Sequence, residues 1–306
     1  MWTTRGLASY RPDRGPAVVA LGTFDGVHRG HRAIFGTAVD RARALGVAAV
    51  ACTFEPHPME VLQPGRAPVP ITTLDERLGL IAATGIDGTL VIDFTAETAR
   101  IEPEAFVSDV VAGRLQAREV VVGFNHSFGR GARGNADLLR KLGERLGFAT
   151  HVVQPFTVDG VAVSSTAIRA ALAAGDVERA ATFLGRPYAV IGEVVRGAGR
   201  GRQLGFPTAI VRPDRLPLVR AGVYACRIEI DGGDHPAVVN VGVRPTFDET
   251  TLAVEAYVLD LSADLYGRRV RVTFLHRLRD ETRFPSVDAL RRQIEADVAQ
   301  ARGLLR

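Results

Sequence analysis

The stretch that decides the fold runs from Val18 to His31 and reads VVALGTFDGVHRGH. Its first part is an apolar run typical of a buried strand, and its second part is a glycine-rich turn that leads into a helix. His28 and His31 are three residues apart where that helix begins, so both imidazoles share one helical face. A helix N-terminus also presents unpaired backbone N–H groups and the positive end of the helix dipole. The segment therefore predicts a phosphate-binding site.

Residues 1–185 continue the alternation of strand and helix that this segment begins. Apolar strands are expected at Ala17–Gly22, Val47–Phe54, Thr89–Phe94, Val120–Gly123 and Ala149–Val153. Helices are expected at His31–Leu45, Leu74–Ala83, Pro103–Leu115, Ala136–Leu146 and Ser165–Ala174. Apolar strands separated by helices form parallel sheets with helices on both faces. Residues 1–185 are therefore predicted to form an α/β, Rossmann-like domain.

The pattern changes near Gly185-Arg186-Pro187, where the domain boundary is expected. Strand candidates separated by turns follow at Tyr188–Val195, Gly222–Ile230, Ala237–Val243, Leu252–Leu259 and Arg269–Phe274. A long helix comes only at Ser286–Leu304. A run of strands closed by one helix predicts a small β-barrel with a terminal helix over residues 186–306.

The composition is that of a globular protein with about two domains, because 306 residues exceed what one hydrophobic core usually holds. The net charge is +4, but Lys141 is the only lysine and the arginines are scattered among acidic residues, which does not favour a nucleic-acid surface. Cys52 and Cys226 have no partners at metal-ligand spacing and are expected as buried thiols. Neither a secretion signal nor a membrane span is recognisable, so we expect a cytoplasmic protein that does not bind membranes.

The histidine pair suits adenylyl transfer, in which a phosphate oxygen attacks the α-phosphorus of a nucleotide and pyrophosphate leaves. Catalysis of that step consists mostly of holding the groups in line and neutralising charge. The imidazoles of His28 and His31 can donate to the phosphate oxygens, and Gly30 between them leaves room for the phosphate. The alternative is a solvated pair at a helix start. The position directly after a strand and a glycine-rich turn favours a functional pair.

The loop Gly123–Asn135 follows another predicted strand. In it Phe124 and Phe128 flank Asn125 and a hydroxyl, an arrangement that can hold a flat heteroaromatic ring by stacking and hydrogen bonds. The alternative is an ordinary glycine-rich surface loop.

Ser164, Ser165 and Thr166 place three hydroxyls where a helix begins, with Arg169 on its first turn. N-capping explains one hydroxyl, whereas three with an arginine suit a polyphosphate. The prolines of Glu55-Pro56-His57-Pro58 mark a rigid turn, in which His57 is either structural or functional.

The second half contains two candidate features. The segment Val195–Ala209 is rich in glycine and arginine, so its backbone N–H groups can wrap a phosphate chain, the alternative being a flexible linker. Glu255 lies among apolar neighbours on a predicted strand. It is either a partly desolvated carboxylate that acts as a general base or a solvated edge residue.

These motifs, taken in order, resemble the bacterial bifunctional riboflavin kinase/FAD synthetase family. In the first half they are GTFDGVHRGH at Gly22–His31, FEPHP at Phe54–Pro58, VVGFN at Val121–Asn125 and SST at Ser164–Thr166. In the second half they are the glycine- and arginine-rich segment, Gly222–Ala225, Asn240–Phe247, Glu255–Asp260 and Asp264–Gly267. The resemblance implies an FMN adenylyltransferase of the nucleotidyltransferase superfamily in the first half. It implies a β-barrel that phosphorylates the 5′-hydroxyl of riboflavin in the second.

The resemblance also implies roles for single residues. His28 and His31 are expected to be catalytic, with Glu255 as the catalytic base of the kinase and Thr208 as a magnesium ligand. Nucleotide or phosphate binding is expected at Gly22, Phe24, Asp25, Gly30, Ser164, Ser165, Thr166, Arg169, Gly199, Arg202 and Gly205, and flavin binding at Phe54, His57, Asn125 and Phe128. The implied small molecules are ATP and Mg²⁺ with riboflavin, FMN and FAD. A monomer or weak homo-oligomer is expected.

One position departs from the family pattern. The family's Pro-Thr-Ala-Asn is here Pro-Thr-Ala-Ile, ending at Ile210, and isoleucine has no oxygen to offer the metal or the nucleotide phosphates. Water can replace a missing magnesium ligand. We therefore predict reduced riboflavin phosphorylation with intact FMN adenylylation. The alternative is an adenylyltransferase whose barrel is impaired by Ile210. A flavin-sensing protein without activity is disfavoured, because a sensor has no need of His28 and His31.

Overall fold

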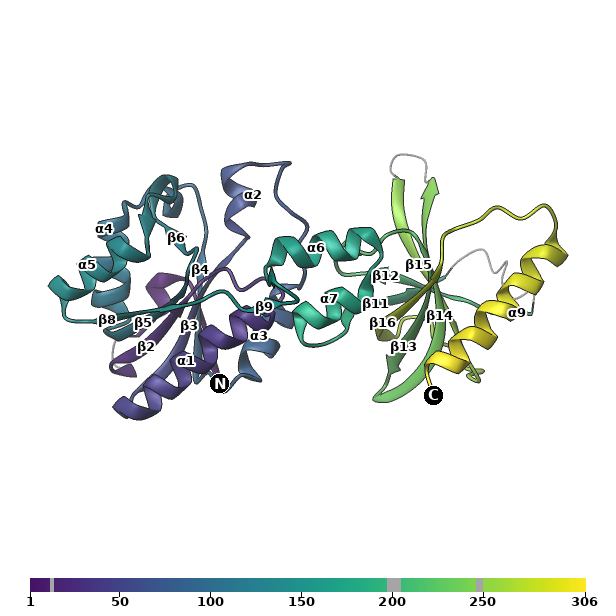
Figure 1. The fold of residues 1–306 in the computed structure, drawn as a ribbon, viewed down its shortest axis with the longest axis horizontal. Helices are drawn as coiled ribbons and strands as arrows, with labels where there is room; N and C mark the ends of the chain where they lie inside the picture. Colours follow the sequence, from purple (N-terminus) through teal and green to yellow (C-terminus); the bar gives the residue numbers. More distant parts are fainter. Residues whose placement is uncertain (12–13, 197–204, 246–249) are drawn as a thin grey trace. The chain divides into compact units, whose positions relative to one another are not determined.

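The computed structural model describes residues 1–11, 14–196, 205–245 and 250–306. Contacts between residues divide the chain into two compact units, Met1–Ser165 and Thr166–Arg306. Figure 1 shows a sheet flanked by helices in the first unit and a barrel in the second. Within the described ranges, no helix is long and apolar enough to cross a membrane.

Unit 1 is built on a parallel sheet that, in the described residues, has the strand order β1-β4-β3-β2-β5-β8. Its strands are β1 (Trp2–Arg5), β2 (Ala17–Leu21), β3 (Ala48–Glu55), β4 (Gly88–Asp93), β5 (Ala117–Gly123) and β8 (Ala149–Val153). Two short hairpins accompany it, formed by β6 (Ser127–Phe128) with β7 (Gly134–Asn135) and by β9 (Thr157–Val158) with β10 (Val161–Ala162). The predicted α/β parallel sheet is confirmed.

The central strand β2 explains why this sheet is covered on both sides. All its residues are buried, and they alternate between two hydrophobic clusters. Val19 and Leu21 belong to the cluster on one face, and Val18 and Ala20 to the cluster on the other. A strand whose residues are apolar on both faces requires a covering layer on each face of its sheet.

The helices of unit 1 supply these two layers (Figure 1). One face packs against α1 (Arg29–Leu45) and α3 (Leu74–Ala82), and the other against the π-helix η4 (Phe106–Arg114) and α5 (Ala136–Leu146). The shorter helices of unit 1 are η1 (Leu7–Ser9), α2 (Pro58–Leu62), η3 (Thr98–Arg100), α4 (Pro103–Ala105) and η5 (Arg130–Ala132). The helix predicted at Pro103–Leu115 is thus one turn of α-helix that continues as a π-helix.

The strand order has a switch point at β2 and β5. From β2 the chain adds β3 and β4 on one side and then returns to add β5 and β8 on the other. Such a switch point leaves a crevice beyond the carboxyl ends of the two central strands, where open α/β sheets bind ligands. The loops that follow β2 and β5 are those with the predicted histidine and asparagine residues.

Unit 2 is a closed antiparallel barrel with the strand order β11-β12-β15-β14-β13-β16 in its described residues. Its strands are β11 (Tyr188–Val195), β12 (Ala209–Pro213), β13 (Gly222–Ile230), β14 (Gly233–Pro245), β15 (Thr250–Val258) and β16 (Arg269–Arg279). The helix α9 (Val287–Leu304) packs on β13, β14 and β16. The predicted small barrel with a terminal helix is confirmed.

Two helices, α6 (Ser165–Ala174) and α7 (Val177–Leu184), precede the barrel. The helix α7 packs on β11 and β16, and Glu178 lies 3.0 Å from the ring nitrogen Nδ1 of His276. The contacts therefore group both helices with the barrel. The division of function near Gly185 stays a prediction.

Candidate active sites

The histidine pair lies at the first turn of α1, where His28 is the N-cap residue. The backbone N–H of His31 donates to Nδ1 of His28 at 3.3 Å. Because Nδ1 accepts this bond, the proton of a neutral His28 imidazole lies on Nε2, which is then a donor. The two rings stack at 3.5 Å between centroids and 21° between planes. The pair is therefore a fixed, close arrangement of imidazoles at a helix N-terminus.

Phe24 packs between the histidine pair and the core of unit 1. Its ring meets the ring of His31 edge-on at 5.3 Å and packs on Phe35, and its side chain is almost completely buried. A Cβ on Gly22 would come within 2.9 Å of the Phe24 ring, so glycine is required there. Phe24 thus packs against one ring of the histidine pair, that of His31.

Gly30 lies in close packing with the same pair. A Cβ at this position would lie 3.2 Å from the His28 ring and 3.6 Å from the carbonyl oxygen of Val163. Gly30 therefore allows the chain that precedes α6 to approach the histidines.

Asp25 fastens the loop after β2 to the segment before α3. Its carboxylate, 2% exposed, accepts hydrogen bonds from the backbone N–H groups of Ile71 at 2.9 Å and Thr72 at 3.2 Å. The N–H of Gly26 donates to the Thr72 hydroxyl at 3.2 Å. These contacts hold the loop in place, and the expected role of Asp25 in nucleotide binding stays a prediction.

The surroundings of His31 hold its imidazole neutral. Burial, and after it the neighbouring His28 and Arg77, lower the pKa of His31 well below its usual value of 6.5. The ring atom Nδ1 of His31 is buried and has no hydrogen-bond partner. A buried polar atom without a partner is uncommon and points to a group that meets a ligand.

The chain before α6 reaches the same loop. The hydroxyl of Ser165 donates to the carbonyl oxygen of Asp25 at 3.0 Å. Ser164 directly precedes α6, and Thr166 and Arg169 lie in its first two turns. The polar segment predicted to bind phosphate thus begins at the histidine loop.

The loop after β5 holds the predicted flavin contacts Asn125 and Phe128, which lie in different surroundings. Asn125 is exposed, whereas Phe128 is 7% exposed and packs on Phe106 in the core. Phe124, which directly follows β5, is 49% exposed. The aromatic ring that solvent reaches in this loop is therefore Phe124.

The turn after β3 holds Phe54 and His57. The partly buried Phe54 meets Phe94 edge-on at 5.8 Å. His57 is the N-cap of α2, where its Nδ1 accepts from the N–H of Met59 at 3.2 Å and Glu60 completes a capping box. This contact gives His57 a structural role, and flavin binding by either residue stays a prediction.

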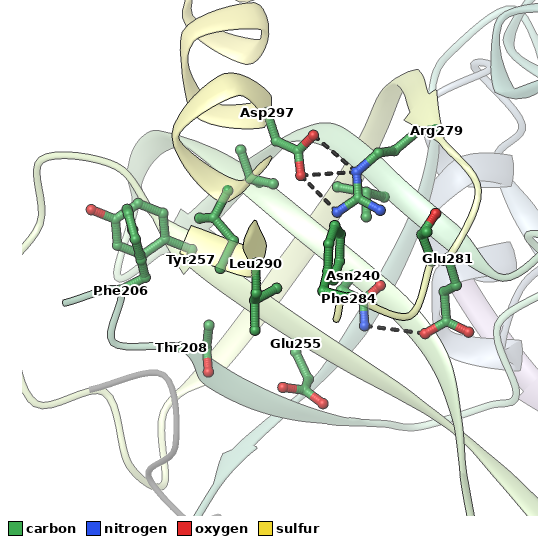
Figure 2. Close-up of a pocket in the computed structure, with 14 residues that line it drawn as sticks. Phe206, Thr208, Asn240, Glu255, Tyr257, Arg279, Glu281, Phe284, Leu290 and Asp297 are labelled. Carbon is green, nitrogen blue, oxygen red and sulfur yellow. Dashed lines mark hydrogen bonds and ion pairs between the residues drawn. The ribbon is translucent and has the colours of Figure 1, made fainter. Parts of the chain in front are cut away.

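The barrel contains a pocket of about 390 Å³, large enough for a flat heterocyclic ligand. It lies between the barrel strands, the loop after β16 and α9 (Figure 2). Apolar and aromatic side chains line much of it: Phe206, Val223, Val238, Tyr257, Phe284, Leu290 and Ile294. Polar side chains line the rest: Thr208, Asn240, Glu255, Arg279, Glu281, Thr282 and Asp297.

The strand register places Glu255 in the middle of the polar part. Glu255 on β15 stands opposite Ile210 on β12 and opposite Asn240 on β14. Directly opposed residues project from the same face of a sheet. Thr208, which directly precedes β12, lines the same pocket. The amide of Asn240 donates to Glu281 at 3.4 Å. The carboxylate predicted to be the base therefore lines one pocket together with the predicted metal ligand Thr208 and the amide of Asn240.

An ion pair closes the pocket on the side of α9, as Figure 2 shows. Asp297, only 3% exposed, accepts from Nε and Nη2 of Arg279 at 3.0 and 2.8 Å and from the amide of Gln293 at 2.9 Å. Arg279 comes from the end of β16, so this pair attaches α9 to the barrel.

Three predicted phosphate contacts lie in or beside the glycine- and arginine-rich segment. Gly199 and Arg202 fall outside the described residues. Gly205 is described, is exposed and has a φ of 84°, a conformation that favours glycine.

The sequence analysis missed Arg77, Asn240 and the pair Arg279–Asp297. Asn240 was part of a quoted motif, but only the register of β14 against β15 shows that it faces Glu255. The other residues meet partners that are distant in sequence, for which the chain offers no local signal.

Comparison with known proteins gives matches for both halves. A family model described as FAD synthetase matches residues 11–167, and one described as riboflavin kinase matches residues 184–305. The bifunctional riboflavin kinase/FMN adenylyltransferase of Pseudomonas fluorescens is 39% identical over 99% of this chain and 98% of its own length. That of Escherichia coli strain K12 is 38% identical over 96% of this chain and 94% of its own.

A solved structure covers nearly the whole chain as well. The crystal structure titled a macrolide-efflux protein from Streptococcus pneumoniae superposes with a TM-score of 0.91 at 31% sequence identity, covering 98% of each chain. Because both family models match, a chain with only the first activity is not favoured.

Proposed function

Because this chain belongs to the bifunctional riboflavin kinase/FMN adenylyltransferase family, we propose how its residues divide the two reactions of that family. The chain is a transferase that makes flavin cofactors: it phosphorylates riboflavin to FMN with ATP and adenylylates FMN to FAD with release of pyrophosphate. We assign the second reaction to the site at the carboxyl ends of β2 and β5, and the first to the barrel.

The observation that carries the adenylyl-transfer assignment is the stacked histidine pair at the switch point of the sheet. An FMN phosphate oxygen attacks the α-phosphorus of ATP, and the bond to the pyrophosphate oxygen breaks. His28, protonated at Nε2, donates to the oxygens on which charge accumulates. His31, neutral in the free enzyme, gains affinity for a proton as the phosphates bind, because anionic neighbours raise the pKa of an imidazole. Neither histidine forms a covalent intermediate.

The remaining parts of the two substrates are assigned to segments beside the histidine pair. We propose that Ser164, Ser165, Thr166 and Arg169 bind the polyphosphate of ATP, because their segment begins beside the loop that carries His28. We propose Asn125, with the exposed ring of Phe124, as the contact to the isoalloxazine ring. A flat aromatic ligand gains stacking energy on such a ring.

In the barrel, Glu255 is proposed to be the general base. It takes the proton of the riboflavin 5′-hydroxyl as that oxygen attacks the γ-phosphorus of ATP, and ADP leaves. Support comes from the position of Glu255 in a pocket that is apolar along much of its wall, which suits an isoalloxazine ring, and polar where the hydroxyl must react.

We include Mg²⁺ in this proposal. Hydroxyl, carboxylate and amide oxygens of Thr208, Glu255 and Asn240 line one pocket, and such hard oxygen donors are those that Mg²⁺ takes. In the described ranges, no cluster of three or more histidine, cysteine, aspartate or glutamate side chains is placed to hold a metal ion. This fits an ion held mainly by phosphates and water, with Thr208 as its protein ligand. The ion supplies neutralisation of phosphate charge.

Location and assembly complete the proposal. ATP and the flavins are its small-molecule partners, and the cytoplasm is the proposed site of both reactions. Neither nucleic acid nor a membrane has a part in it, and the protein acts as a monomer or weak homo-oligomer.

The purified chain with ATP, Mg²⁺ and either riboflavin or FMN tests these assignments. Chromatography is expected to show FAD from FMN, and FMN followed by FAD from riboflavin, the first step being slower because of Ile210. Absence of FAD from an incubation with FMN would refute the assignment of the histidine site.

A further inference from the structure

A buried arginine lies between the carboxyl ends of β2 and β3. Arg77 comes from the middle of α3, and its side chain is only 5% exposed. Arginine side chains are rarely buried to this degree unless their charge and donors are partnered. The resemblance to the family gave it no role.

The guanidinium of Arg77 joins two segments that carry predicted site residues. Nη1 donates to the carbonyl oxygen of Thr23 at 2.9 Å, and Nη2 donates to the carbonyl oxygen of Phe54 at 3.1 Å and to the carboxylate of Glu55. The hydroxyl of Thr53 donates to the same Thr23 oxygen at 2.9 Å. The loop after β2 is thus fixed to the end of β3 by a planar fork with several donors.

The loop held in this way needs support, because its backbone is strained. Phe24 and Val27 have positive φ values of 53° and 42°, which are costly for side chains of their size. The segment before α3 already holds this loop through Asp25 and Gly26. Arg77, three residues into the same helix, holds its beginning at Thr23. Such strain persists where the surroundings fix it, and it is concentrated at active sites.

Two further observations concern the donors of Arg77 and the effect of its charge on the histidine pair. The guanidinium N–H at Nε is buried without a hydrogen-bond partner, so the buried side chain is not fully satisfied by the contacts it makes. The charge of Arg77 also helps, after burial and His28, to lower the pKa of His31. The cation therefore acts electrostatically on one of the two rings that the loop positions.

We propose that Arg77 is a positioning residue for FMN adenylylation, which fixes the strained loop Thr23–Val27 so that His28 and His31 stay stacked at the start of α1. This role rests on the proposed assignment of adenylyl transfer to that pair. Because the interaction is made before the reaction begins, its loss lowers kcat more than it raises KM.

The test compares Arg77→Met with the matched control Arg5→Met. Arg5 is an exposed arginine of the same unit, 3.7 Å from Asp75 on the same helix α3, and its removal is expected to change nothing. R77M is expected to lower kcat for FAD formation from FMN by about 10- to 100-fold, with KM for FMN changed less than about threefold. Riboflavin phosphorylation by the same sample is expected to be unchanged, which shows that unit 2 has folded. A urea unfolding transition of unit 1 that is retained in R77M shows that the unit carrying Arg77 has folded as well.

Two additional readouts separate positioning from simple structural damage. The pKa of the His31 imidazole, followed by NMR, is expected to rise in R77M because a nearby positive charge is lost. Arg77→Lys keeps the charge but not the fork, so it is expected to leave that pKa unchanged and to recover only part of kcat. If R77M fails to fold, the partial loss of kcat expected for R77K still tests the positioning role.

Wild-type kcat in R77M, or equal losses of both activities in R77K, would overturn the proposal. The wild-type protein distinguishes this failure from that of the proposed function. If it forms no FAD from FMN, the assignment of the site is wrong, whereas FAD formation that is insensitive to Arg77 refutes the positioning role alone.

Discussion

Ile210 stands directly opposite Glu255, so an apolar side chain borders the carboxylate proposed to be the base. On its other side Glu255 faces the amide of Asn240. Ile210 itself therefore offers no oxygen directly opposite the carboxylate. We expect the cost of this departure to fall on the reaction assigned to the barrel and not on the reaction assigned to the histidine site.

Ile210→Asn is expected to raise kcat for riboflavin phosphorylation by about tenfold, which corresponds to about 1.4 kcal/mol of barrier, because it adds an oxygen ligand beside Thr208. FAD formation from FMN is expected to stay constant. Initial rates of FMN formation from riboflavin measure the effect. Ile210→Val is the matched control, since it keeps the position apolar. An I210N protein no faster than wild type would show that the missing amide does not limit this kinase.

The burial of His126 is expected to make the stability of unit 1 depend on pH. It follows Asn125, stacks on Phe128 at 5.7 Å between ring centroids, and its Nε2 atom is buried without a partner. Burial lowers the pKa of His126 to about 4 from its usual 6.5. Between these pH values the unfolded chain binds the proton and the folded chain does not, so stability falls as the pH is lowered.

This difference predicts that His126 contributes about 2 kcal/mol to the loss of unfolding free energy between pH 7.5 and pH 5. His126→Phe, which keeps a ring without a titrating group, is expected to reduce the loss by that amount. Urea unfolding of unit 1, followed at both pH values, measures it. An unchanged pH dependence in H126F would assign the acid sensitivity to other groups.

At the scale of elements, α9 depends on one buried ion pair. Asp297 accepts from Arg279 and from Gln293, and the same helix contributes Leu290 and Ile294 to the pocket wall. Loss of one partner of a buried pair leaves the other charge uncompensated, which costs several kcal/mol. Attachment of α9 and the shape of the proposed flavin pocket are therefore linked.

Asp297→Asn is expected to lower the unfolding free energy of the barrel by about 3 kcal/mol and to raise KM for riboflavin, while FAD formation from FMN is retained. Thermal unfolding and the kinetics of both reactions measure these effects. Glu295→Gln serves as the control, because Glu295 is an exposed carboxylate of the same helix paired with Arg291 at 3.4 Å. Exposed pairs contribute about 1 kcal/mol or less. Equal effects of the two substitutions would contradict the special role of Asp297.

Helices and strands were predictable from the sequence where the spacing of apolar residues determines them. The buried strands of unit 1, its long helices and most barrel strands follow the apolar pattern of the sequence. The strand β1 has no such pattern, and it forms because Trp2–Arg5 pairs with the exposed edge of β4 at Gly88–Val91. The short strand β12 was likewise missed. Such edge pairing is a tertiary contact that local patterns do not encode.

The site residues likewise divide into those that a local pattern predicts and those that only long-range contacts bring to the site. His28 and His31 were recognisable because one helical turn brings them together, and Glu255 because of its apolar neighbours. Arg77 meets Thr23, which is 54 residues away in sequence, and the pair Arg279–Asp297 joins a strand to a helix. Only the folded chain shows these contacts.

At the scale of the whole molecule, the two units carry sites that differ in every proposed group. A histidine pair on a parallel sheet is proposed to serve adenylyl transfer, and a carboxylate in a barrel is proposed to serve phosphorylation. The FMN produced by one reaction is consumed by the other. We therefore expect that a single substitution in one site abolishes one reaction and leaves the other intact.

Product analysis of two variants tests this claim most directly. His28→Asn keeps a good N-cap for α1 but removes the imidazole, and Glu255→Gln keeps the shape of the proposed base but removes its proton affinity. Each protein is incubated with ATP, Mg²⁺ and either riboflavin or FMN, and the flavins are separated by chromatography. H28N is predicted to convert riboflavin to FMN at the wild-type rate and to form FAD at least about 100-fold more slowly. E255Q is predicted to form FAD from FMN normally and almost no FMN from riboflavin. Loss of both reactions in either variant, or wild-type FAD formation by H28N, would contradict the assignment of the two reactions to separate sites.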